Sequence, residues 1–172
     1  MESLEAKAKV ISQLLSEQLE KGNHLEVTVV SNSMSPLIQA NDKVIVEKFL
    51  PQKLFAGDII LFTFRQTFCT HRYILKRRKN NIVEYITKGD RFFRFDRPIS
   101  EDKIIGKITT IIKNSTQVDL STITYKLRRL IIVLSSTIKW YFYLTLKWLF
   151  IKFSNSEKFD RLFIMEHSQH EN

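Results

Sequence analysis

The chain has 172 residues, a formal net charge of +9 and one cysteine, Cys69. Its length suits one domain with an appendage and allows a hydrophobic core without disulfide bonds, and a lone cysteine excludes an internal disulfide. The surplus of basic residues suits an anionic membrane surface or a nucleic acid. We interpret the basic run at residues 76–79 as a solvated hairpin, and we expect no nucleic-acid partner.

Residues 1–23 have the spacing of an amphipathic helix. Leucine, valine and isoleucine side chains recur near helical spacing from Leu4 to Leu19, and glutamates take the other side. Gly22-Asn23 predicts the end of this helix. Its apolar runs are too short and too polar for a signal peptide or a membrane span, so we expect no crossing of a membrane here.

Residues 24–115 change to short apolar runs separated by turn residues. The predicted strands are 25–30, 43–48, 58–64, 69–76, 82–87 and 103–113. Asn80-Asn81 is the predicted tip of a hairpin, because asparagine tolerates the left-handed conformation. The pattern predicts a compact, mostly antiparallel β domain. The expected fold class is therefore mainly β (α+β), with an N-terminal amphipathic helix and C-terminal apolar helices.

Residues 121–165 form an apolar, aromatic and basic segment with helical character. A helix over residues 130–151 would be about 33 Å long, enough for a hydrocarbon core of roughly 30 Å. Lys139 and Lys147, however, offset most of the free energy of insertion that its apolar residues would contribute. Ser136, Lys139, Tyr143 and Lys147 would form one polar stripe. We therefore expect an interfacial helix and a membrane-associated protein, and the alternative is packing on the β domain or on a partner.

Three polar residues of the β region are the types that a serine hydrolase requires. Ser33 lies where a β-branched run ends in Ser31-Asn32-Ser33-Met34-Ser35-Pro36, and the proline fixes a turn just after it. A hydroxyl attacks, an imidazole such as that of His71 takes its proton, and a carboxylate such as that of Asp96 orients the imidazole. Residue types alone do not distinguish this set from the scattered Ser, His and Asp of any β domain.

The spacing of the surrounding motifs is more specific. In order they are Ser31–Pro36, the apolar runs after Asn41-Asp42 and Gly57-Asp58, Thr70-His71-Arg72-Tyr73-Ile74, Thr87-Lys88-Gly89-Asp90 with Asp96 six residues further on, and Gly106-Lys107-Ile108. Over residues 27–112 this series resembles the type I signal peptidases of the LexA-like serine peptidase superfamily. It is most similar to the archaeal and endoplasmic-reticulum branch, which uses His where the bacterial branch uses Lys.

The resemblance implies a signal-peptidase-like catalytic domain over residues 24–115 that cleaves a leader or signal peptide from a precursor protein. Ser33 would be the nucleophile, His71 the general base and Asp96 its orienting carboxylate. The backbone N–H of Ser33 and the hydroxyl of Ser31 would stabilise the oxyanion, and Asp90 would support the site by shaping its turn. No cofactor is expected, and the Cys and His residues show no metal-ligand spacing.

The sequence departs from the family pattern in ways that keep alternatives open. Asn32 and Asn41 replace glycines, although asparagine tolerates a positive φ. Arg91-Phe92-Phe93 replaces a polar pair before Asp96, and the family's N-terminal anchor is missing, so the side of the membrane that the active site faces stays open. The alternatives are a self-cleaving LexA-like domain, whose only Ala-Gly bond, Ala56-Gly57, lies downstream of Ser33, and a non-catalytic membrane-surface or regulatory module.

Overall fold

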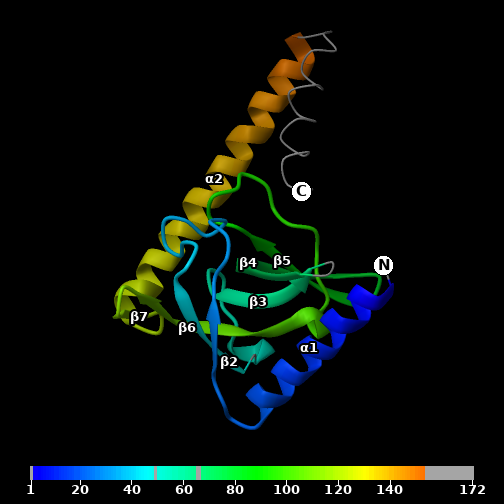
Figure 1. Ribbon diagram of the computed structural model, residues 1–172. Helices are drawn as coiled ribbons and strands as arrows, with labels where there is room; N and C mark the ends of the chain where they lie inside the picture. The colour runs from blue at the N-terminus through cyan, green and yellow to red at the C-terminus, as the bar shows by residue number, and fades with distance from the viewer. Residues whose placement is uncertain (1, 49, 65–66, 154–172) are drawn as a thin grey trace. The chain divides into compact units, whose positions relative to one another are not determined.

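The computed structural model describes residues 2–48, 50–64 and 67–153. The chain divides into two compact units, of which the first is Met1–Ser136 and the second begins at Thr137. The first unit contains the sheet, the N-terminal helix and the start of the C-terminal helix (Figure 1).

In the described part of the chain, seven antiparallel strands form one sheet. The elements in chain order are α1 (Glu2–Glu20), β1 (Leu25–Thr28), β2 (Lys43–Lys48), β3 (Ile59–Phe64), β4 (Thr67–Lys79), β5 (Ile82–Lys88), β6 (Ile104–Lys113), β7 (Thr116–Asp119) and α2 (Ile123–Phe153), with 3-10 turns η1 (Pro51–Lys53) and η2 (Glu101–Lys103). The spatial order is β1-β2-β6-β3-β4-β5, and β7 pairs with the end of β6. The expected mainly β α+β fold is confirmed at this level.

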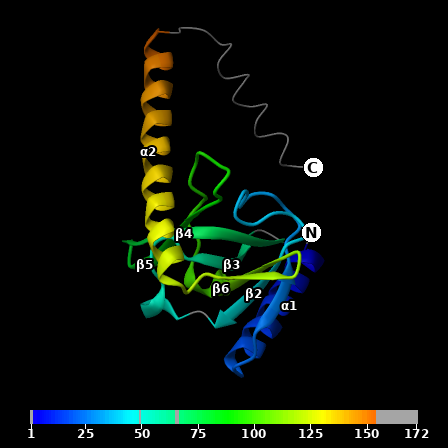
Figure 2. The same cartoon turned by 90° about the vertical axis from the view of Figure 1, so that its left-hand side faces the viewer.

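Strand β3 is buried on both faces and divides the core into two clusters. Ile59 and Leu61 join the larger cluster, which includes Leu19 of α1, and Ile60 and Phe62 join the smaller one. Alternate residues of a strand point to opposite faces, so a continuous apolar run is the pattern of a strand covered on both sides. α1 lies along β1, β2 and β6 and covers the larger cluster (Figures 1 and 2).

The predicted hairpin tip is confirmed, and one strand was missed. Asn80 and Asn81 both have positive φ between the paired residues Lys79 and Ile82. Strand β7 lies beyond residue 115, where we expected the β domain to end. Its side chains are all exposed and only Val118 is apolar, so it has no alternating pattern, and its turn places Ser115 at a positive φ that serine rarely adopts.

Helix α2 begins at Ile123, where the Thr122 hydroxyl accepts a hydrogen bond from the Tyr125 N–H at 3.4 Å. Of the predicted segment 121–165, residues 154–165 lie outside the described ranges. Across those ranges, no helix combines the length and the apolar character needed to cross a bilayer.

The first turn of α2 belongs to the core of the first unit. Tyr125 is 7% exposed, packs in the larger cluster and accepts a hydrogen bond from Nη1 of Arg72 at 3.1 Å. Burial raises the pKa of the Tyr125 hydroxyl, and the nearby Arg72 charge opposes that rise only in part. The first compact unit therefore extends past β7 into α2.

The contribution of Tyr125 can be measured against a second tyrosine of the same helix. Tyr125→Ala removes a buried ring and the partner of a buried guanidinium, so it should lower the free energy of unfolding by about 3 kcal/mol. Tyr141, which is 61% exposed, is the matched control, and Tyr141→Ala should change stability by less than about 0.5 kcal/mol. Urea denaturation followed by circular dichroism measures both. Equal midpoints for the two variants would show that α2 does not support the sheet.

Candidate active site

Ser33 lies in the loop between β1 and β2. Backbone hydrogen bonds fix the base of this loop, and two buried side chains anchor it to the core. Backbone bonds join Val29 N–H to the Asp42 carbonyl at 2.9 Å and Asn41 N–H to the Val29 carbonyl at 2.8 Å. The side chains of Met34 and Ile38 are fully buried in the larger core cluster. This anchoring leaves Ser33 partly exposed on a loop that has little freedom to move.

Asn32 and Asn41, which stand where the signal-peptidase motifs have glycine, differ in their conformations and contacts. Asn41 has a φ of 73°, as its sequence position led us to expect. Asn32 does not have a positive φ, so that explanation is wrong for this residue. Its side-chain oxygen instead accepts a hydrogen bond from the Ala40 N–H at 2.9 Å, which ties the two arms of the Ser33 loop together. The Asn32 side chain thus helps to fix the shape of the loop by a bond between residues eight positions apart.

His71 lies on β4, opposite Ile60 of β3. Its ring is largely buried and makes edge contacts with Phe62 and Phe92, with ring centroids 6.0 and 6.1 Å away. Nδ1 lies 2.7 Å from Oδ2 of Asp96. This carboxylate fixes the ring's orientation, and with Nδ1 so engaged Nε2 is the nitrogen left to exchange a proton.

Asp96 is held from two sides in the loop that follows β5. Its N–H donates to the Thr87 carbonyl at 2.9 Å, and the Thr87 hydroxyl donates to Oδ2 at 2.7 Å. The same oxygen therefore meets both Thr87 and His71. Sequence reasoning missed this role of Thr87, which is fully buried, although its place at the start of the Thr87–Asp90 motif was the available signal.

Gly89 lies where the three segments meet. A Cβ atom built on it would be 3.0 Å from the Ser33 carbonyl oxygen, 3.1 Å from Nε2 of His71 and 2.7 Å from the Phe92 ring. The Ser33 carbonyl also accepts a hydrogen bond from the Arg91 N–H at 3.0 Å. The structure therefore brings Ser33, His71 and Asp96 to one place, and the glycine is required there because any side chain would separate them.

Ser31 and Asp90, the two predicted supporting residues, also lie at this site. The hydroxyl oxygen of Ser31 is 3.3 Å from that of Ser33. Asp90 forms a two-pronged ion pair with the Nε and Nη2 atoms of Arg72, at 2.7 and 2.5 Å. The Ser31 hydroxyl is thus near the Ser33 hydroxyl, and the ion pair of Asp90 with Arg72 fixes the turn between Gly89 and Arg91.

Arg72 is a supporting residue that the sequence did not identify. Its guanidinium is 1% exposed and also donates through Nη1 to the Gly57 carbonyl at 2.7 Å and to Tyr125. Burial disfavours its charge, but the bonds and the charge of Asp90 outweigh burial and raise the pKa of Arg72 above its ordinary value. The only sequence signal was its place next to His71, because none of its partners is near it in the chain.

In the part of the chain that the structure describes, Cys69 and the acidic residues do not form a metal site, and the Cys69 thiol is not activated. Burial raises the pKa of the Cys69 thiol above its ordinary value, and this outweighs the lowering by the Thr67 hydroxyl, while the Asp96 charge adds a smaller rise. The thiolate, which is the nucleophilic form, is therefore disfavoured. Within the described ranges, no three His, Cys, Asp or Glu side chains are grouped as metal ligands are.

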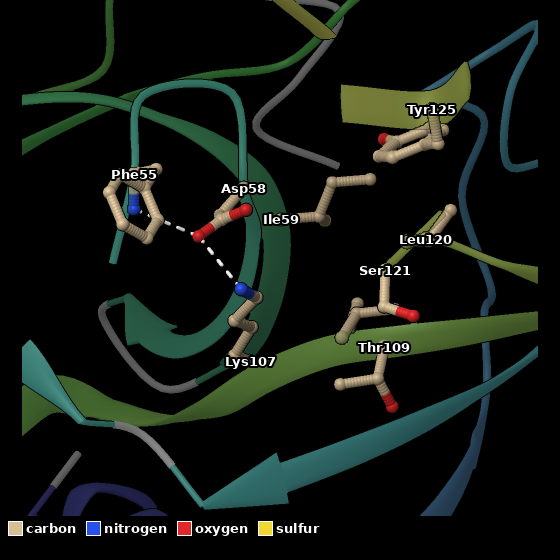
Figure 3. Close-up of a pocket in the computed structure, with 9 residues that line it drawn as sticks. Phe55, Asp58, Ile59, Lys107, Thr109, Leu120, Ser121 and Tyr125 are labelled. Carbon is tan, nitrogen blue, oxygen red and sulfur yellow. Dashed lines mark hydrogen bonds and ion pairs between the residues drawn. The ribbon is translucent and has the colours of Figure 1, made fainter. Parts of the chain in front are cut away.

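A shallow pocket of about 190 Å³ lies between β3, β6 and the start of α2 (Figure 3). Asp58 at its wall accepts hydrogen bonds from Lys107 Nζ and the Phe55 N–H, both at 2.9 Å. Ile59, Leu120 and Tyr125 supply apolar lining. Ser33, His71 and Asp96 are not among its lining residues, so this pocket is distinct from the candidate active site.

No protein-family model matches this sequence, and a search of curated proteins finds no match either. The geometry of the site therefore carries the functional argument.

Breaking the buried ion pair between Arg72 and Asp90 should lower the free energy of unfolding substantially. Arg72→Met keeps most of the side chain's length but leaves the Asp90 carboxylate, which is 11% exposed, without its partner. The free energy of unfolding should therefore fall by about 3–5 kcal/mol. Arg78→Met on the exposed end of the same strand is the matched control and should have an effect below about 0.5 kcal/mol. Chemical denaturation of both variants measures the difference. A loss of less than about 1 kcal/mol for Arg72→Met would contradict this role.

Proposed function

We propose that the chain is a serine endopeptidase of the signal-peptidase type, which removes a leader or signal peptide from a precursor protein. The observation that supports this most is the position of His71. Its Nδ1 lies 2.7 Å from Oδ2 of Asp96. A Cβ atom built on Gly89 would lie 3.1 Å from its Nε2 and 3.0 Å from the Ser33 carbonyl oxygen, so the Ser33 and His71 segments are close together there. A nucleophile, a base and an orienting group are thus near one another in the order that acyl transfer requires.

The proposed reaction follows from these positions. The Ser33 hydroxyl attacks the scissile carbonyl carbon and gives its proton to Nε2 of His71, and Asp96 stabilises the imidazolium that forms. His71 then passes this proton to the leaving amine, and Ser33 is left as an ester of the leader. A water molecule, deprotonated by the same nitrogen, attacks the ester, and its proton returns to Ser33 when the leader's carboxylate departs.

The developing oxyanion requires donors on the Ser33 side of the substrate. The backbone N–H of Ser33 and the hydroxyl of Ser31, 3.3 Å from that of Ser33, are the proposed donors. One such donor is typically worth about 3 kcal/mol of transition-state stabilisation. Phe62 and Phe92 enclose the imidazole, and the low local polarity strengthens these interactions.

The resemblance to signal peptidases also suggests the substrate class, a peptide with small side chains at the first and third positions before the cut. Within this proposal, cleavage of a separate precursor is favoured over cleavage of the chain itself. Gly57 of the Ala56-Gly57 bond is buried, its N–H donates to the Tyr73 carbonyl at 2.7 Å, and its carbonyl accepts from Arg72. A bond held in this way is not available to an active site in the folded chain.

The assignment predicts complete loss of cleavage on removal of either reacting group. Ser33→Ala and His71→Ala should each lower the rate about 10³-fold or more, with the fold intact, because neither residue carries the core. The substrate is a leader-bearing precursor, or a peptide library with small residues at the first and third positions, and mass spectrometry identifies the products.

Ser100→Ala is the matched control, because Ser100 makes no side-chain cap bond at the start of η2, and it should cleave at the wild-type rate. Cleavage by Ser33→Ala at the wild-type rate would end the assignment. A folded wild-type chain that cuts no member of such a library would favour the non-catalytic alternative.

A further inference from the structure

The part of α2 that follows Ser136 carries an exposed apolar face. Ile138, Tyr141, Phe142 and Leu149 recur at spacings of three, four and seven residues, which places them on one side of a helix. All four are exposed, Ile138 by 67% of its surface. Thr145, which falls within this face, donates its hydroxyl to the Phe142 carbonyl at 2.8 Å, so its polar atom is satisfied within the helix.

The same helix is strongly and uniformly cationic. Between Ser121 and Ser156 the sequence has no Asp or Glu and six basic residues, Lys126, Arg128, Arg129, Lys139, Lys147 and Lys152. On the helix, Lys139 and Lys147 fall outside the apolar face, with Tyr143 midway between them. The segment therefore combines an apolar side with six basic residues and no acidic residue of its own.

The apolar face and the positive charge together favour an anionic bilayer as the binding partner over a second copy of the helix or a nucleic acid. A second copy of the helix would cover the apolar face, but two such helices repel each other because neither has an acidic residue to pair across the interface. A nucleic acid would neutralise the lysines and leave the aromatic face in water. An anionic bilayer surface can bind both parts of the helix, because the acyl chains contact the apolar side and the lipid phosphates pair with the lysine ammonium groups.

We propose that α2 beyond Ser136 lies in the interface of an anionic bilayer, with Ile138, Tyr141, Phe142 and Leu149 inserted toward the acyl chains. Lys139 and Lys147 then reach the headgroups. This inference uses none of the proposed catalytic residues, so it stands or falls separately from the peptidase assignment.

Flotation of the full-length chain with lipid vesicles tests the proposal. Vesicles of phosphatidylcholine with phosphatidylglycerol should bind the protein at about 0.1 M salt and release much of it at about 1 M, and pure phosphatidylcholine should bind it weakly. Ile138→Glu should lower binding to the anionic vesicles at least about tenfold. Lys139→Gln should lower it about fivefold on anionic vesicles and leave binding to phosphatidylcholine unchanged.

Ile82→Glu is the matched control, because Ile82 is 59% exposed at the hairpin tip and the substitution changes the net charge equally. It should bind as the wild type does. The proposal would be overturned if the protein did not float with anionic vesicles at low salt, or if Ile82→Glu and Ile138→Glu lost vesicle binding equally. Binding that resists both high salt and alkaline carbonate would also contradict it. So would a dimer in solution that Ile138→Glu dissociates while vesicles bind no protein.

Discussion

The buried guanidinium of Arg72 joins parts of the chain that are far apart in sequence. It holds Asp90 after β5, the Gly57 carbonyl before β3 and the Tyr125 hydroxyl at the start of α2. A buried cation is tolerated only when its donors are satisfied, so these three segments cannot move apart without leaving a charge unpaired. Because adjacent residues of a strand face opposite ways, β4 presents His71 to the site and Arg72 to the scaffold.

The turn at residues 89–91 connects the Arg72 contacts to the candidate site. Gly89 allows the Ser33 and His71 segments to approach, Asp90 is fixed by Arg72, and the Arg91 N–H holds the Ser33 carbonyl. Ser33, His71 and Asp96 come from a loop, a strand and a second loop, and each makes a hydrogen bond to a different segment of the chain. These bonds restrict the positions of the three residues relative to one another.

Local sequence patterns predicted much of the fold. The features that they did not predict, such as β7 and the contact between Arg72 and Tyr125, are not marked by any local pattern. Short apolar runs separated by turn residues predicted six strands, and Asn80-Asn81 predicted a two-residue turn, because both depend on neighbouring residues. Strand β7 is exposed and nearly all polar, so no periodicity marked it. The spacing of motifs predicted Ser33, His71 and Asp96 together, but the bond between Arg72 and Tyr125 joins residues that only the tertiary structure brings together.

The pairing of Ser33 with His71 is the central claim, and it can be measured without knowing the substrate. In a Cys69→Ala background, Ser33→Cys carries the only thiol of the chain, and its alkylation by iodoacetamide can be followed against pH. An imidazole next to this thiol stabilises the thiolate, so reaction should begin well below the pH of about 8.5 at which an ordinary thiol ionises. Adding His71→Ala should then move the profile up to that of an ordinary thiol. The same profile with and without His71 would contradict the pairing.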